Sequence, residues 1–157
     1  WGNGRAGQLG MAHIGYIDKK STPVKVDRPA GLSPSDRVKK VEVGIWHSCM
    51  LMTSGRVFCW GTNAYGHLGA NLAPGALPNN RSVKPIEILV GPGGIPAGQR
   101  IIDLAAGANR GCAVVENGHS YCWGLNDAGQ IGDGTHIDAR APTESLFLRP
   151  TQNRYIY

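Results

Sequence analysis

The four cysteines are the residues of this 157-residue sequence whose spacing most directly suggests chemistry. Cys59 follows Cys49 by ten positions, and Cys122 follows Cys112 by ten. Zinc sites usually contain a C-x-x-C pair, which the sequence lacks, and the nearest histidines are not spaced as zinc ligands. The spacing therefore favours two disulfides over a metal site, with four reduced thiols in the core as the alternative.

A turn signal between the cysteines decides which of them face each other. Segments 53–55 (TSG) and 116–118 (ENG) both end on glycine, which a three-residue hairpin loop with a G1 bulge requires at its left-handed third position. Counting outward from these loops places Cys49 opposite Cys59 and Cys112 opposite Cys122. If the loop-closing residues are hydrogen-bonded, each cysteine pair is of the closer, non-hydrogen-bonded type. We therefore predict the disulfides Cys49–Cys59 and Cys112–Cys122, and with them an oxidising compartment.

Other residues with chemical potential stand in unsuitable surroundings. His47 and Ser48 are neighbours in a predicted strand, so their side chains point to opposite faces and form a poor nucleophile pair. A histidine with satisfied hydrogen bonds, in the core or in a loop, is the better interpretation of His47. Residues 2–7 (GNGRAG) match the dinucleotide fingerprint G-x-G-x-x-G, but no helix is predicted after them. The sequence thus offers no catalytic residue, no metal ligands and no cofactor site.

An internal repeat supplies the elements that position these residues. The segments 1–10 (WGNGRAGQLG), 60–69 (WGTNAYGHLG) and 123–132 (WGLNDAGQIG) share a tryptophan, glycines and a Leu or Ile. Residues 44–61 also align without a gap on 107–124, and a short apolar run precedes each of these segments. After each motif comes an extended segment that contains proline, at 22–26, 83–89 and 141–143. Three units, 1–59, 60–122 and an incomplete 123–157, each predict three or four short strands, and the motif glycines and tryptophans are interpreted as scaffold.

The pattern from 44 to 69, "G..HSC.L...G.VFCWG.N..G.LG", resembles the repeat of the regulator of chromosome condensation family of β-propellers. The resemblance implies a seven-bladed propeller in which each blade is a four-stranded antiparallel sheet. The cysteine pairs are more similar to those of the bacterial and secreted branches than to the nuclear exchange factor. Two departures stand out: Arg110 and Gly111 replace His47 and Ser48, and Gly4 stands where the other motifs have asparagine.

The predicted fold class is all-β, an incomplete section of about two and a half blades from a larger propeller. Such a section cannot close a ring, so its open edges favour completion by more of the same chain or by a partner chain. A content of 41% hydrophobic and 17% charged residues suits a packed protein, and no apolar run approaches the roughly 20 residues of a membrane span. No leader peptide opens the sequence, so we expect any targeting signal to lie outside it.

The net charge of +5 is concentrated in the first third of the chain. Its lysines at 19, 20, 25, 39 and 40 are interspersed with carboxylates, which favours a solvated face over a patch that attracts nucleic acid or an acidic protein.

The preferred function is a non-enzymatic scaffold that binds another protein in a secreted, periplasmic or cell-surface setting. The loops 11–21, 70–81 and 90–99 are the expected contact regions, with Tyr16, Arg81 and Lys84 as candidate partner-binding residues. Reduced cysteines would instead fit a nuclear or cytoplasmic protein. The resemblance then implies an alternative, a nucleotide-exchange factor for a small GTPase with chromatin contact. A second alternative is a structural subunit that assembles through its open blade edges. The sequence is also compatible with a catalytic domain elsewhere in a longer polypeptide.

Overall fold

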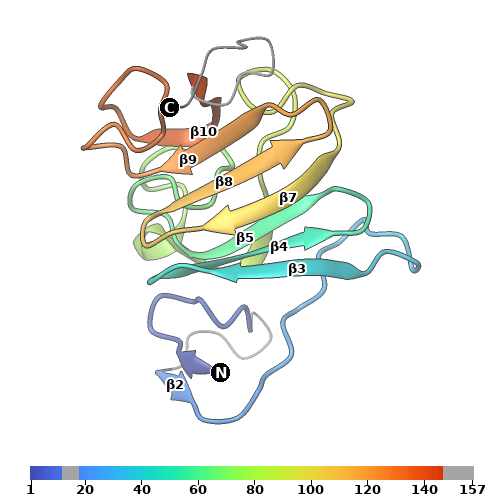
Figure 1. Ribbon diagram of the computed structural model, residues 1–157. Coiled ribbons are helices and arrows are strands. Elements are labelled where there is room, and N and C mark those ends of the chain that lie inside the picture. Colours follow the sequence, from blue (N-terminus) through green and yellow to red (C-terminus); the bar gives the residue numbers. More distant parts are fainter. Residues whose placement is uncertain (12–17, 147–157) are drawn as a thin grey trace, which may run out of the picture.

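The computed structural model describes residues 1–11 and 18–146, and it contains two four-stranded antiparallel sheets whose strands follow one another in chain order (Figure 1). The first sheet consists of β3 (Val38–Val43), β4 (His47–Met52), β5 (Val57–Thr62) and β6 (Arg81–Glu87). The second consists of β7 (Ile101–Ala106), β8 (Arg110–Val115), β9 (Ser120–Gly124) and β10 (Ala139–Glu144). A short ladder joins β1 (Gly2–Asn3) to β2 (Lys19–Lys20), and a 3₁₀ turn, η1, spans Pro78–Asn80. The all-β prediction is confirmed, and within the described ranges no helix is long and apolar enough to cross a membrane.

The two sheets are out of step with the sequence repeat. Each sheet begins with the apolar run before a hairpin and ends with the segment after a Trp-Gly motif, so the sheets span 38–87 and 101–144. A repeat unit such as 60–122 therefore supplies strands to both sheets.

The hairpin register agrees with the prediction from the turn residues. Gly55 and Gly118 have φ of +87° and +86°, the left-handed conformation that the bulge requires. Met52 N donates to Arg56 O at 2.8 Å, which makes the loop-closing pair hydrogen-bonded. Cys49 then pairs with Cys59 across β4 and β5, and the same register recurs between β8 and β9.

One predicted extended segment, 22–26, forms no strand, whereas 83–87 and 141–143 lie in β6 and β10. The pairing of Gly2 with Lys20 in β1–β2 repeats that of Gly61 with Ser82 in β5–β6, so β1–β2 is the equivalent ladder. Later residues of β6 pair with Phe58 and Cys59, and the positions equivalent to these would precede Trp1. Val26 packs instead against the buried side chains of the first sheet.

The main core lies between the two sheets. Its buried side chains include Leu51 and Val57 from the first sheet, Leu104 and Trp123 from the second, and Ile95 from the connection between them. At the edge of this core, lysines of β3 reach β7: Lys39 Nζ donates to Ile102 O at 2.7 Å, and Lys40 Nζ donates to Asp103 at 2.9 Å and to Leu104 O at 2.7 Å. These two lysines therefore join the sheets while they stay accessible to solvent: Lys39 is exposed, and the side chain of Lys40 is 38% exposed.

The repeated motif links each unit to the one before it. The Trp60 indole N–H donates to Gln8 O at 2.8 Å, and the Trp123 indole N–H donates to His67 O at 2.9 Å. A Cβ added at Gly69 would lie 3.1 Å from the Trp123 ring, and its φ of +63° also favours glycine. The motif glycines thus allow the next unit's tryptophan to approach closely, in agreement with the scaffold interpretation.

Candidate interaction surface

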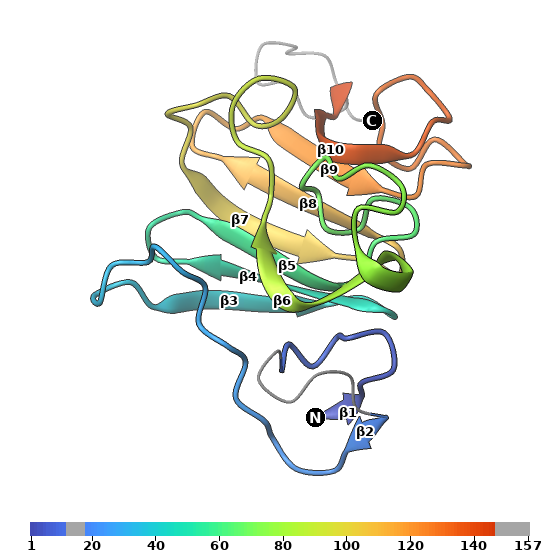
Figure 2. The same cartoon turned by 180° about the vertical axis from the view of Figure 1, so that it is seen from behind.

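The connections between strands gather at two opposite ends of the sheets. We call "motif end" the end that carries the turns 44–46 and 107–109 and the loops 63–80 and 125–138. The other end, the "hairpin end", carries the turns 53–56 and 116–119 and the connection 88–100. Figure 2 shows the loop with η1 at one end of β6 and the connection to β7 at the other. The predicted contact loops 70–81 and 90–99 consequently lie at opposite ends and do not form one surface.

The three predicted contact residues fall in different environments. Tyr16 lies outside the described residues. Lys84 is exposed on β6, where its backbone N–H donates to Ser82 Oγ at 3.0 Å. The Arg81 guanidinium donates to Arg5 O and so ties β6 to the N-terminal loop. The structure does not bring these residues together.

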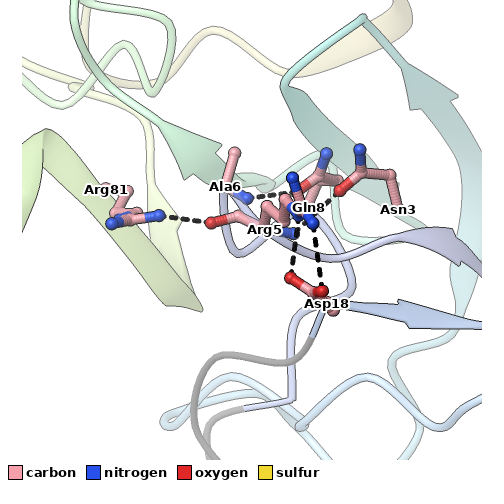
Figure 3. A network of polar contacts seen from close by, with 6 residues as sticks. All are labelled: Asn3, Arg5, Ala6, Gln8, Asp18 and Arg81. Carbon is pink, nitrogen blue, oxygen red and sulfur yellow. Dashed lines mark hydrogen bonds and ion pairs between the residues drawn. The ribbon is translucent and has the colours of Figure 1, made fainter.

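Arg81 belongs to the polar network drawn in Figure 3. Arg5 forms a two-pronged ion pair with Asp18, with Nε–Oδ1 at 2.8 Å and Nη2–Oδ2 at 3.1 Å, and its backbone N–H donates to Asn3 Oδ1 at 2.9 Å. The hydrogen bonds and charge of Arg5 lower the pKa of Asp18 below its ordinary value. The network therefore uses the charge of Arg5 within the molecule, and both partners of the ion pair are exposed.

An aromatic cavity of about 370 Å³ opens at the motif end of the first sheet. Trp46 from the β3–β4 turn, Tyr65 and His67 from the motif loop, and Asn109 from the β7–β8 turn line it. Trp46 is 44% exposed and Tyr65 is 43% exposed, and their neighbour Ile45 is 58% exposed. Large apolar side chains that stay accessible around a cavity are typical of binding surfaces. We call Ile45, Trp46 and Tyr65 the aromatic rim.

Sequence reasoning missed the aromatic rim because Tyr65 stood in a motif interpreted as scaffold and Trp46 was not considered. A signal was available, since Trp46 aligns with Asn109 in the next unit. A tryptophan at a turn position that the other repeat fills with a polar residue is not needed for the turn itself.

Two buried histidines lie behind this cavity. His47 is fully buried, and its ring centre lies 5.2 Å from that of His67. Burial lowers the pKa of His47 to about 4, the neighbouring His67 adds to the shift, and the backbone of Arg110 opposes it. His47 is therefore a histidine of the core, one of the two placements that the sequence allows. It packs against Gly44, where a Cβ would lie 2.4 Å from its ring.

His67 connects the buried pair to the cavity wall. Its Nδ1 accepts from Tyr65 N at 3.3 Å, which places the proton on Nε2, 3.4 Å from Asn109 Oδ1. Burial lowers the pKa of His67 as well. Among the described residues, no group of three or more His, Cys, Asp or Glu side chains could hold a metal ion.

A second cavity of about 250 Å³ occupies the equivalent place on the second sheet. Asn109, Arg110, Leu125 and Gln130 line it, and these residues stand 63 positions after Trp46, His47, Thr62 and His67. The two cavities share Asn109, and the two turns are joined by a hydrogen bond from Ile45 N to Ala108 O of 3.1 Å. The same position of the repeat therefore carries an aromatic cavity on one blade and a polar cavity on the next.

Both cysteine pairs lie at disulfide distance. The sulfur atoms are 2.13 Å apart in Cys49–Cys59 and 2.16 Å apart in Cys112–Cys122. The first pair is fully buried in the core between the sheets, whereas Cys112 is only partly buried.

Comparison with known proteins decides the family. Two models of the regulator of chromosome condensation (RCC1) repeat match the chain, one over residues 1–51 and 54–114, the other over 38–66 and 101–130. The chain belongs to the RCC1 repeat family. The resemblance noted in the sequence is thus confirmed, and the sequence of RCC1 repeats accounts for the two four-stranded sheets.

Relatives of this RCC1-repeat chain are much longer than the chain itself. It is 36% identical over 135 residues to the human E3 ubiquitin-protein ligase HERC2, which covers 86% of the chain and 2% of that protein. It is 32% identical over 114 residues to the mouse RCC1 domain-containing protein 1, which covers 73% of the chain and 26% of that protein.

Solved structures share the fold. Human WBSCR16 superposes with a TM-score of 0.73 at 23% identity, covering 89% of the chain and 32% of that structure. Yeast RCC1 (Prp20), solved bound to Kap60, superposes with a TM-score of 0.70 at 21% identity, covering 96% of the chain and 32% of that structure. The chain therefore corresponds to about a third of such a molecule.

Proposed function

We propose that this RCC1-repeat chain is a section of a non-enzymatic, protein-binding scaffold that works in an extracellular, periplasmic or cell-surface setting. The observation that carries the binding role is the aromatic rim: the β3–β4 turn holds Ile45 and Trp46 exposed, the motif loop holds Tyr65 exposed, and Trp46 and Tyr65 line a cavity. Exposed aromatic and aliphatic side chains beside a cavity suit recognition of another protein. The sequence relatives named as ubiquitin ligases are matched only across their repeats, so we assign this chain no catalysis of its own.

Site-directed photocrosslinking tests the binding role. A photoreactive amino acid is placed at Ile45, and in a matched control at Ile137, which is 74% exposed on the β9–β10 loop and lines neither cavity. We expect the protein in its native setting to crosslink a partner protein from position 45 and not from position 137. Equal crosslinking from both positions, or none from either, contradicts a binding surface at the rim.

The cysteine pairs support the proposed compartment, since disulfides persist in oxidising environments and are rare in reducing ones. The test is to block free thiols during extraction of the native protein and to map the cysteines by mass spectrometry without reduction. We expect peptides linked as Cys49–Cys59 and Cys112–Cys122. Four blocked thiols would contradict the compartment and leave the binding role standing.

A second candidate is regulation of a small GTPase in contact with chromatin. It is favoured by the likeness to the yeast protein Prp20p, whose solved structure was described with its binding properties to Gsp1p and histones. The test is release of labelled GDP from a small GTPase in the presence of this protein. Accelerated release together with reduced cysteines would favour this candidate over the scaffold in an oxidising compartment.

A third candidate is a subunit that assembles through its open edges. It is favoured by β3, on which Val38, Val41 and Val43 are 52%, 55% and 67% exposed. Unpaired, apolar strand surfaces promote association. Light scattering of the purified chain tests the candidate: a concentration-dependent mass supports assembly, and a constant monomer mass excludes it.

A further inference from the structure

We infer that the two neighbouring cavities at the motif end together bind one extended peptide, with an apolar side chain beside Trp46 and a carboxylate at Arg110. This inference rests on the proposed binding function and names the partner class of the same surface.

The first argument is the arrangement of the cavities. They occupy equivalent positions on adjacent blades, share Asn109, and lie along two turns that are hydrogen-bonded to each other through Ile45 N and Ala108 O. A ligand that enters both must pass across Asn109. The volumes of about 370 Å³ and 250 Å³ each suit single side chains, and two such pockets in a row suit successive side chains of one extended chain.

The second argument is the chemistry of the first cavity. Trp46 and Tyr65 expose nearly half of their surface and flank the opening, while His67 forms part of the wall. The pKa of His67 lies below its ordinary value because it is buried, so the wall is uncharged near neutral pH. Aromatic walls of this kind gain most from covering an apolar side chain, and tryptophan and tyrosine are enriched among the residues that dominate interface energies.

The third argument is the charge in the second cavity. Arg110 is exposed, and within residues 1–11 and 18–146 its guanidinium makes no hydrogen bond or ion pair. It differs in this from Arg5, which is paired with Asp18, and from Arg100, which is paired with Glu116. A free guanidinium beside a cavity suits a carboxylate, which it can bind through two parallel hydrogen bonds.

One carboxylate of the chain lies on the loop beside the second cavity. Asp127 is exposed, and its Oδ1 accepts from Gln130 Nε2 at 2.9 Å. This hydrogen bond occupies Asp127 within its own loop, and no ion pair joins it to Arg110 in the described part of the chain. The guanidinium therefore stays available to an acidic residue of the ligand.

The test selects peptides from a random 12-residue display library on the native protein and measures the selected peptides by fluorescence polarisation. We expect sequences that combine an aromatic or large aliphatic residue with Asp or Glu. Trp46→Ala and Arg110→Glu should each weaken their binding by at least about tenfold, because each removes the central contact of one cavity. Trp46→Phe should retain most of the affinity, and added salt should weaken binding to the native protein more than to Arg110→Glu.

Two control variants match the test variants: one removes an exposed apolar side chain, as Trp46→Ala does, and the other removes an exposed positive charge, as Arg110→Glu does. Ile137→Ala removes an exposed apolar side chain outside both cavities, and Lys25→Ala removes an exposed positive charge. Both should bind like the native protein, and urea unfolding of every variant verifies that it is folded. A library that yields no binder, or peptides that bind Trp46→Ala as tightly as the native protein, overturns the inference. A crosslinked partner protein at position 45 would in that case still support the scaffold function.

Discussion

The turns 44–48 and 107–111 share their backbone hydrogen bonds but differ in their side chains: the first carries Trp46, and the second carries Arg110. In each, the first glycine donates its N–H to the carbonyl three residues later at 2.9 Å, from Gly44 to His47 and from Gly107 to Arg110. Each turn also accepts from the strand beside it, at Trp46 O and Asn109 O, both at 2.9 Å. These backbone contacts fix the turn without using its side chains. The repeat can therefore carry different side chains on successive blades at little cost to the fold.

The residues behind the turns differ for a packing reason. Gly111 faces the Trp123 ring, and a Cβ there would lie 2.5 Å from it, so only glycine fits. At the equivalent position Ser48 is accommodated, and its hydroxyl donates to Gln8 O at 3.0 Å, the same carbonyl that accepts from Trp60. Trp123 is the more deeply inserted of the two tryptophans because it lies in the core between two complete sheets.

Replacement of these tryptophans should give the largest effect. Trp123→Ala removes a fully buried ring and its hydrogen bond to His67 O, so we expect a loss of about 3–5 kcal/mol in the free energy of unfolding. Trp60→Ala should cost less, because Trp60 packs in the smaller cluster with Met50, Met52 and Phe58. Urea denaturation of both variants checks the order, and an equal or larger loss for Trp60→Ala would contradict it.

The two cysteine pairs provide the next comparison. Both close loops of the same sequence separation, 10, so the chain-entropy contribution should be the same, about 2–4 kcal/mol. Cys49→Ala with Cys59→Ala also leaves space in the core between the sheets, whereas Cys112→Ala with Cys122→Ala changes a partly exposed site. We expect the first double variant to melt at the lower temperature in calorimetry under oxidising conditions. Equal melting temperatures would show that burial of the first pair adds nothing.

Acid should destabilise the first blade more than the second, because the first has the buried His47 where the second has the exposed Arg110. The pKa of His47 is about 4 in the folded chain and near 6.5 when unfolded, so only the unfolded state takes up the proton between these values. Burial of neutral His47 therefore lowers the free energy of unfolding only in acid. Above pH 6.5 there is no loss, and as the pH falls toward 4 the loss grows to about 3 kcal/mol.

The measurement is urea unfolding between pH 7 and pH 5, a range in which the carboxylates keep their charge. His47→Phe should reduce the slope of stability against pH, and His67, whose pKa is also lowered by burial, should contribute to the slope that is left. A variant slope as steep as that of the native protein would show that His47 is not the titrating group.

Local features of this fold could be predicted from the sequence because they depend on residues close together in the chain. The glycines that end the two turns require a positive φ, so they fix the hairpin register and the facing of the cysteines within about ten residues. The motif tryptophans and glycines likewise identify the repeat. These parts of the prediction needed no knowledge of how one unit packs on the next.

Features that depend on contacts between units were missed. Lys39 and Lys40 are accessible to solvent, as expected, but they also bind the second blade across a separation of more than 60 residues, which no local pattern indicates. The segment 22–26 has strand-like residues, but Val26 packs against buried side chains of the first sheet, which are more than 20 residues away in the sequence. The aromatic rim exists only because two turns and a motif loop from different parts of the chain meet at one cavity.

The account's central claim is that the motif residues build the fold while the turn residues are free to serve recognition. The unfolding free energy of Trp46→Ala tests this most directly, because Trp46 is as large as Trp123 but is 44% exposed. We predict a loss within about 1 kcal/mol of the native value, since little apolar area leaves the core. A loss of about 3 kcal/mol or more, comparable to that expected of Trp123→Ala, would make Trp46 part of the scaffold and contradict the claim.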